Sequence, residues 1–324
     1  MTPVELSRTV LHAVRRAVDE GELSVSVPER AVVAVPGPGG CGDYATGIAL
    51  QLARPSGRPS RQVAEILRGH LVRAGGVAAV EITGPGFLNI SLDGGGTADL
   101  VRRVLRDGPR YGHSGALAGQ VLRVRVPDEI RAEVVADALG RVVASQGGRL
   151  DVVRGCNGDA DLRPVPAPGD PAALGPDAAR WALLHPAPHD RPRIDAGHLV
   201  QRESNPLFRV RYAHARTRAL CRNAADLGFG AEPGDVTLAP ALPGALADHP
   251  RVLTTAATHR APDRLARHLV VVADAVLPFL PTVLPRGAEK PSAAHRARLA
   301  LAEAAGTVLA GGLSLLGIDA PDHL

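Results

Sequence analysis

Arginine and aromatic side chains are concentrated in one short segment, residues 202–222. Six of its residues are arginine, and its single acid is Glu203. Drawn as a helix that turns about 100° per residue, the segment places Phe208 and Tyr212 on one narrow stripe. Arginines flank this stripe on both sides: Arg211, Arg218 and Arg222 on one, and Arg209 and Arg216 on the other. Such a stripe can stack a nucleobase and hold the adjacent phosphates. A core stripe bordered by solvated arginines is the alternative.

Other residue types that carry chemistry lack the partners that they would need. Twelve histidines are scattered along the chain, and no carboxylate or thiol completes a tetrahedral set around them. No Ser-His-Asp order and no G-x-S-x-G motif is present. Cys41, Cys156 and Cys221 are far apart and odd in number, which excludes a disulfide framework and favours a reducing cytoplasm. We therefore expect no catalytic residue, no metal and no cofactor.

The composition is that of a globular chain. Of the 324 residues, 45% are hydrophobic and 22% are charged, and bases exceed acids by 37 to 33. These values exclude a disordered or collagen-like chain and leave room for two or three domains. Apolar runs are shorter than the roughly 18 residues that span a bilayer, and the first residues lack the pattern of a signal peptide. The sequence therefore predicts no membrane association.

Hydrophobic patterning divides the chain into three regions. Residues 1–120 mix helical spacing with alternating runs, including a hairpin over 80–92, and are typical of an α+β domain. Residues 121–154 indicate a strand, a helix and a strand, which is the βαβ element of a parallel sheet. Residues 155–175 are rich in Pro, Gly and Asp and indicate a linker. Residues 176–324 are predicted to be helical almost throughout.

The turn that opens the βαβ helix carries acids instead of glycines. It contains Pro127, Asp128 and Glu129. Two carboxylates suit the positive end of a helix dipole but exclude a nucleotide phosphate. The glycine-rich loop at 37–44 is equally unsuited, because Asp43 lies at the expected helix N-cap and no lysine follows. Structural turns are therefore predicted at both places.

Several longer segments resemble one enzyme family, the arginyl-tRNA synthetases. The resemblance to the family's N-terminal additional domain rests on GDYATGIALQLAR (42–54), VEITGPGFLNISL (80–92) and YGHSGALAGQ (111–120). The resemblance to its C-terminal DALR-type anticodon-binding domain rests on NPLFRVRYAHAR (205–216), RLARHLVVVADAVLPFL (264–280) and RLALAEAAGTVLAGGLSLLGIDAP (298–321).

This resemblance implies three parts. Residues 1–120 would be an α+β domain that contacts the D-loop or elbow of tRNA. Residues 121–175 would be a vestigial catalytic fragment, a truncated Rossmann βαβ unit, with a linker. Residues 176–324 would be an all-α helical bundle of the class Ia anticodon-binding type.

The middle part departs from the family. The family's catalytic domain carries a His-x-Gly-His signature after its first strand, and these residues contact ATP. We match the helix of the βαβ element to the helix that follows this signature in the family. The match places Val126 and Glu129 at the two His positions, Asp128 at the glycine, and Arg131 at the basic residue after them. Val126, Asp128 and Glu129 cannot donate a hydrogen bond to phosphate. The resemblance therefore implies a degenerate paralogue without an ATP or arginine site, and leaves enzymatic activity open with inactivity favoured.

The resemblance also nominates RNA-binding residues. In the first domain it implies stacking by Phe87 and base-edge hydrogen bonds by Asn89. In the last domain it implies contacts by Tyr212, Arg216 and Leu324, to which the helical pattern adds Arg209, Arg211, Arg218 and Arg222.

The expected function is therefore tRNA binding without autonomous aminoacylation. The expected partner is tRNA of the arginine type, in the cytoplasm, with neither DNA nor a membrane. Two alternatives remain open at this point. One is a protein–protein module that binds a synthetase or another tRNA-using enzyme. The other is a residual or tRNA-dependent enzyme of the arginine–tRNA ligase class.

Overall fold

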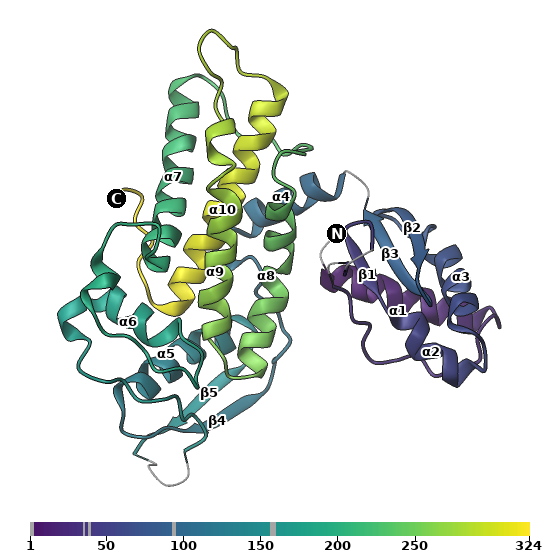
Figure 1. Cartoon of the computed structure of the whole chain (residues 1–324), viewed down its shortest axis with the longest axis horizontal. Coiled ribbons are helices and arrows are strands. Elements are labelled where there is room, and N and C mark those ends of the chain that lie inside the picture. Colours follow the sequence, from purple (N-terminus) through teal and green to yellow (C-terminus); the bar gives the residue numbers. More distant parts are fainter. Residues whose placement is uncertain (1–2, 35, 38–39, 93–94, 156–159) are drawn as a thin grey trace. The chain divides into compact units, whose positions relative to one another are not determined.

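The hairpin predicted over 80–92 is the centre of the N-terminal part of the chain. In the computed structural model, strands β2 (Val77–Thr83) and β3 (Phe87–Leu92) pair antiparallel, and the short strand β1 (Tyr44–Thr46) pairs with the other edge of β3. Helices α1 (Pro3–Asp19), α2 (Ile48–Ser56) and α3 (Ser60–Leu71) pack with this sheet (Figure 1). Helices α2 and α3 contact the sheet and α1 packs on α3. Burial of their apolar stripes forms one hydrophobic core, which includes Leu6, Val10, Leu67, Leu88 and Ile90.

The structure describes residues 3–34, 36–37, 40–92, 95–155 and 160–324. Contacts divide the chain into two compact units, unit 1 (Met1–Leu100) and unit 2 (Val101–Leu324). The division falls within helix α4 (Gly95–Asp107). The segments 121–175 and 176–324 therefore belong to one body by contacts, and their separation into functional domains stays a prediction.

One local expectation in unit 1 is wrong. Asp43 was expected to cap a helix, but the residues after it form β1, and α2 begins only at Ile48. The Asp43 carboxylate instead accepts a hydrogen bond from the backbone N–H of Leu92, at 2.8 Å. A contact 49 residues away along the chain therefore decides the conformation here.

The predicted βαβ element is confirmed. Strands β4 (Val121–Arg125) and β5 (Arg149–Val153) pair in parallel, joined by helix α5 (Ile130–Ser145). Val124 pairs with Val152 across the two strands. Helix α5 packs on β5 and on helices α6 (Pro176–Leu184), α8 (Ala241–Thr258) and α10 (Ala293–Leu316). Among the described residues no further strand extends this sheet.

A helical bundle makes up the rest of unit 2, as expected (Figure 1). It contains α7 (Pro206–Asp226), α8 (Ala241–Thr258), α9 (Asp263–Val276) and α10 (Ala293–Leu316). Helix α10 contacts each of the other three and α5. Glycines on α10 allow this close packing, because a Cβ at Gly306 would clash with Thr217 Oγ1 and a Cβ at Gly311 would lie 2.9 Å from the Pro109 carbonyl oxygen.

Gly311→Ala is expected to destabilise unit 2 by about 1–3 kcal/mol, because the added methyl group meets a backbone oxygen that cannot rotate away. Gly244→Ala is the matched control, since Gly244 is an exposed glycine in α8 with no atom within 4 Å of the added Cβ. That variant should gain up to about 1 kcal/mol from helix propensity. Urea unfolding measures both changes, and equal effects of the two substitutions would contradict the packing argument.

Two segments of the bundle are long and apolar enough to cross a membrane by length and composition, namely Asp263–Thr282 and α10. In α10, 72% of the apolar stretch is buried inside the protein's own fold. Core helices of globular bundles show the same character.

Candidate nucleic-acid interface

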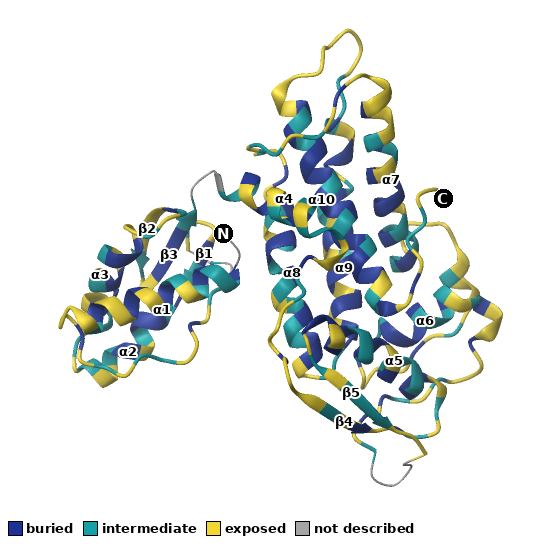
Figure 2. Ribbon diagram, turned by 180° about the vertical axis from the view of Figure 1, so that it is seen from behind, coloured by how far each residue is buried: buried dark blue, intermediate teal, exposed yellow. Residues whose placement is uncertain are grey.

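Local sequence signals position helix α7, which carries most of the predicted RNA-binding residues. Asn205 caps the helix, because its side-chain oxygen accepts from the backbone N–H groups of Leu207 and Phe208 at 3.1 and 3.4 Å. Pro206 occupies the first turn, where a missing N–H costs nothing. Val210 and Thr217 are buried in the bundle, while exposed and intermediate residues line the side turned away from α10 (Figure 2).

Phe208 and Tyr212 lie side by side on α7, as the helical spacing predicted. The rings of Phe208 and Tyr212 stack with centroids 5.5 Å apart and planes 20° apart. The Arg216 guanidinium lies over the Tyr212 ring, with Cζ 5.9 Å from its centroid. Tyr212 is 38% exposed. A flat aromatic surface edged by a cation is therefore open to solvent, which is the arrangement on which nucleobases stack.

The other arginines of α7 are paired within the chain. Arg209 forms an ion pair with Asp274 of α9, and Arg211 forms one with Asp177 of α6. Arg211 Nε also donates to the backbone oxygen of Asp319, at 3.0 Å. The sequence pattern of α7 alone does not show that Arg209 and Arg211 have acidic partners. Their acidic partners are more than 30 residues away along the chain, and no spacing rule for one helix finds them.

Arg218 and Arg222 are bound by the last described residues. Arg218 Nε lies 3.1 Å from Asp322 Oδ1, and Arg222 Nη2 donates to the Asp322 backbone oxygen at 3.4 Å. The hydrogen bond from Arg218 holds the pKa of the Asp322 carboxyl below its usual value. Asp322 is therefore ionised at neutral pH and offsets part of the positive charge of α7.

Leu324 lies beside the aromatic stripe. It lines a cavity of about 280 Å³ together with Phe208, Arg211, His198 and Asn205. This leucine is 56% exposed. The structure thus brings Leu324 beside the residues of α7 that were predicted to bind RNA. The contact of these residues with RNA stays a prediction.

In unit 1 the two nominated residues lie on one strand, β3, two positions apart, and so on the same face of the sheet. Phe87 is 42% exposed and available for stacking. Asn89 is buried, and its side-chain amide donates to Thr83 Oγ1 at 2.7 Å. Because Asn89 is 2% exposed, base contact would require its side chain to become accessible.

The altered signature turn lies at the start of α5. Val126 is fully buried, and Asp128 is exposed. Glu129 is the N-cap of the helix, since Oε2 accepts from the backbone N–H of Ala132 at 2.9 Å, and Oε1 accepts from that of Ala167 at 3.1 Å. The protein's own carboxylate therefore uses a backbone donor at this helix N-terminus, the kind of position at which anions bind in other proteins.

The described cysteines are thiols. Burial raises the pKa of Cys221 to about 11, and a hydrogen bond to Glu81 raises that of Cys41. Both are free cysteines, and Cys156 lies outside the described residues.

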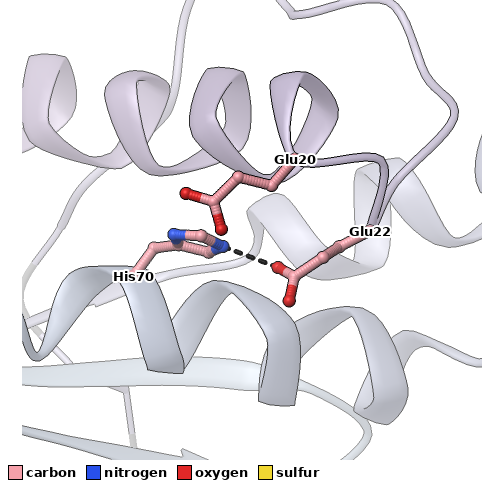
Figure 3. A group of neighbouring side chains, drawn as sticks. All are labelled: Glu20, Glu22 and His70. Carbon is pink, nitrogen blue, oxygen red and sulfur yellow. Dashed lines mark hydrogen bonds and ion pairs between the residues drawn. The ribbon is translucent and has the colours of Figure 1, made fainter.

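Glu20, Glu22 and His70 are close enough together to ligate a metal (Figure 3). One ligand atom of each lies within 4.8 Å of the others. His70 Nε2 and Glu22 Oε2 share a hydrogen bond of 2.7 Å, which joins the end of α1 to α3. Exposed acidic groups commonly cluster in this way without a metal. The expected absence of a metal stays a prediction.

Two family matches fall on the two ends of the chain. Residues 5–92 match the arginyl tRNA synthetase N terminal domain, and residues 210–324 match the DALR anticodon binding domain. The chain is an arginyl-tRNA synthetase-related protein. In this arginyl-tRNA synthetase-related protein, residues 319–324 and most of α7 lie inside the second match.

Curated relatives agree with this assignment. The arginine–tRNA ligase of Frankia alni is 40% identical over 161 residues, which are 45% of this chain and 28% of that protein. The arginine–tRNA ligase of Renibacterium salmoninarum is 40% identical over 163 residues, 46% of this chain and 30% of that protein. The matched part therefore spans less than a third of the length of these relatives.

Solved structures show the same fold. Thermus thermophilus arginyl-tRNA synthetase aligns with a TM-score of 0.71 and 15% identity, covering 100% of both chains. The arginyl-tRNA synthetase of Plasmodium falciparum aligns with a TM-score of 0.68 and 8% identity, covering 99% of both. Both structures support a mostly helical fold with small sheets.

Proposed function

We propose that this arginyl-tRNA synthetase-related protein binds tRNA, of the arginine type, in the cytoplasm and without aminoacylating it. The observation that carries the proposal is the Phe208–Tyr212 stack on α7 with Arg216 over the exposed Tyr212 ring. Tyr212 and Arg216 lie within the segment that matches an anticodon binding domain, and Phe208 lies two residues before it. Stacking on a single-stranded loop and pairing of arginines with phosphates are the interactions that this surface supplies.

Two observations support the absence of aminoacylation. Glu129 caps the helix that follows the first parallel strand, so that N-terminus cannot also bind a phosphate. The βαβ element has two strands, and in the described chain none follows between β5 and α6. We interpret it as a truncated Rossmann unit. Adenylate formation requires preorganised donors around the α-phosphate, and we expect no arginine-dependent ATP–pyrophosphate exchange, with or without tRNA.

The binding test is a salt titration of tRNA affinity. Each phosphate neutralised contributes about 0.7–0.9 to the slope of log K against log salt. Replacing Arg211, Arg218 and Arg222 together by Gln is expected to flatten that slope by about 2, measured by fluorescence anisotropy of labelled tRNA.

The matched control removes the same charge elsewhere in unit 2. Arg123, Arg149 and Arg154 are exposed arginines of the β4–β5 region, and their replacement by Gln should leave the slope nearly unchanged. If both triple variants flatten the salt slope equally, tRNA affinity depends on the protein's net charge and not on the arginines of α7. Absence of salt-dependent tRNA binding in the wild-type protein would favour the protein–protein module instead.

A further inference from the structure

Unit 2 contains a cavity of about 200 Å³ beside the βαβ element. The residues that line it come from α5, from the segments 161–164 and 184–188, and from the turn between α8 and α9. Pockets for drug-sized ligands span about 300–1,000 Å³, and a water molecule in the liquid takes about 30 Å³. The cavity is therefore too small for a nucleotide and large enough for one small ion with a few waters.

Arg260, on the wall of this cavity, has a backbone conformation that normally belongs to glycine. Three other helices, α1, α5 and α7, end at a glycine with positive φ, namely Gly21 (74°), Gly147 (79°) and Gly228 (75°). Helix α8 ends with the same pair of backbone hydrogen bonds, from Arg260 to Ala257 and from Ala261 to Ala256, but Arg260 takes the glycine position with φ 54°. A side chain in this conformation costs free energy, and such residues cluster at ligand-binding sites.

Arg131 brings a buried positive charge to the same wall. It is 1% exposed, and its N–H groups donate to backbone oxygens. In the described parts of the chain it forms no ion pair, and Glu129, Asp190 and Asp263 act on its charge from farther away. A guanidinium bound only by neutral acceptors leaves a net positive potential in the cavity.

The other charges of the wall leave Arg260 available. Asp161 is bound by Arg125, whose Nε and Nη2 donate to the two carboxylate oxygens at 3.2 and 3.1 Å. Arg163 Nε donates to the Ala160 backbone oxygen at 2.9 Å. For the Arg260 side chain the described structure gives a longer-range interaction with Asp161, and neither a hydrogen bond nor an ion pair. Its guanidinium can therefore bind an anion without first losing a partner.

Asp263 supplies an acceptor that lacks a donor. Its side chain is 6% exposed and forms an ion pair with Arg267 through Oδ2. Oδ1 is buried and, among the described residues, has no hydrogen-bond partner. A buried acceptor without a donor is costly, so a ligand of this cavity gains by offering a hydroxyl or N–H group to Asp263 as well as a negative charge to Arg260.

We propose that this cavity is a binding site for free hydrogen phosphate. Arg260 donates to the phosphate oxygens, the charge of Arg131 attracts them, and the P–OH group donates to Asp263 Oδ1. A hydrogen bond from a hydroxyl to a carboxylate is charge-assisted and strong. This site lies outside helix α7 and is independent of the proposed tRNA binding.

The hydrogen bond to Asp263 selects among oxyanions. Sulfate and the phosphodiesters of RNA carry no proton at neutral pH. A phosphate monoester has a second pKa of about 6 and loses its proton there as well. Hydrogen phosphate keeps one proton, so it alone among these anions pairs with both the arginine and the carboxylate.

Calorimetric titration of the full chain with sodium phosphate and with sodium sulfate tests this selection. At pH 7.5 and constant ionic strength, phosphate is expected to bind at least about tenfold more tightly than sulfate, because sulfate leaves Asp263 without a donor. Equal affinities for the two anions, or no binding of either, would overturn the proposal.

Arg260→Gly separates a ligand-binding role from a structural one. Glycine relieves the positive φ, so the variant should be more stable than wild type in the absence of phosphate. Its affinity for phosphate should fall by about tenfold or more, since a charge-assisted hydrogen bond is lost. The control is Arg264→Gln, because Arg264 is exposed and does not line the cavity. It should bind phosphate within about twofold of wild type. Unchanged binding by Arg260→Gly would refute the site.

Asp263→Asn tests the acceptor. The amide can donate to an oxyanion, so the preference for phosphate over sulfate should fall from about tenfold to about twofold or less. This ratio compares two anions on one variant and does not depend on how stable that variant is. A preference that survives in Asp263→Asn would show that Asp263 does not accept the phosphate proton.

Discussion

Replacing Arg131 by Met is expected to destabilise unit 2 by about 3–5 kcal/mol. Arg131 is 1% exposed, and its five N–H groups donate to five backbone oxygens. The acceptors belong to Val165, Leu183, Pro186, Ala187 and Asp190, at 2.7–3.0 Å. Methionine fills a similar volume but leaves these five carbonyls, two in buried and three in part-buried hydrogen bonds, without the Arg131 donors.

Urea unfolding of Arg131→Met against Arg131→Lys and Arg123→Met measures this effect. Lysine offers three donors in place of five, in the wrong geometry, and should recover only part of the loss. Arg123 is exposed on β4 and pairs with Asp151 at the surface, so its loss should cost less than about 1 kcal/mol. A change below about 1 kcal/mol for Arg131→Met would show that the segment 183–190 is held by other contacts.

Acidification is expected to destabilise unit 2 between about pH 6.5 and pH 4. Three histidines, His113, His249 and His268, pack where α8, α9 and the turn after α4 meet, and the rings of His249 and His268 stack at 5.3 Å. In the described structure one buried ring nitrogen of each has no hydrogen-bond partner. Burial lowers the pKa of all three, to about 4 for His268.

The sign follows from proton uptake. Above about pH 6.5 both the folded and the unfolded histidines are neutral, and no stability is lost. Below that value the unfolded chain binds protons that the folded chain refuses, so the free energy of unfolding falls as the pH falls. For His268 alone the loss approaches about 3 kcal/mol at pH 4. Asp248 opposes this effect at His268, and Arg251 adds to it.

Unfolding curves at several pH values test the expectation. His249→Gln with His268→Gln should flatten the dependence between pH 6.5 and pH 4.5. The control is His189→Gln, because the His189 side chain is 84% exposed. It should leave the dependence unchanged. An NMR titration that finds His249 and His268 with pKa values near 6.5 would contradict the argument.

Local patterns were sufficient for most of the secondary structure. The hairpin over 80–92, the βαβ element and the aromatic stripe on α7 depend on side-chain periodicity and on turn residues, which act over a few positions. The family resemblance, carried by long collinear segments, also came from the sequence, and the domain matches confirm it.

The tertiary structure alone decided which polar groups are free. Asp43 bonds to Leu92 in place of capping a helix, and Asn89 is buried in its hairpin. Arg131, which the resemblance matched to the basic residue after an ATP signature, donates to backbone carbonyls of Val165 and of the segment 183–190. Arg218 finds its carboxylate 104 residues away. A sequence pattern reports which face a side chain occupies, whereas the partner of a charge depends on which remote segment the folded chain brings beside it.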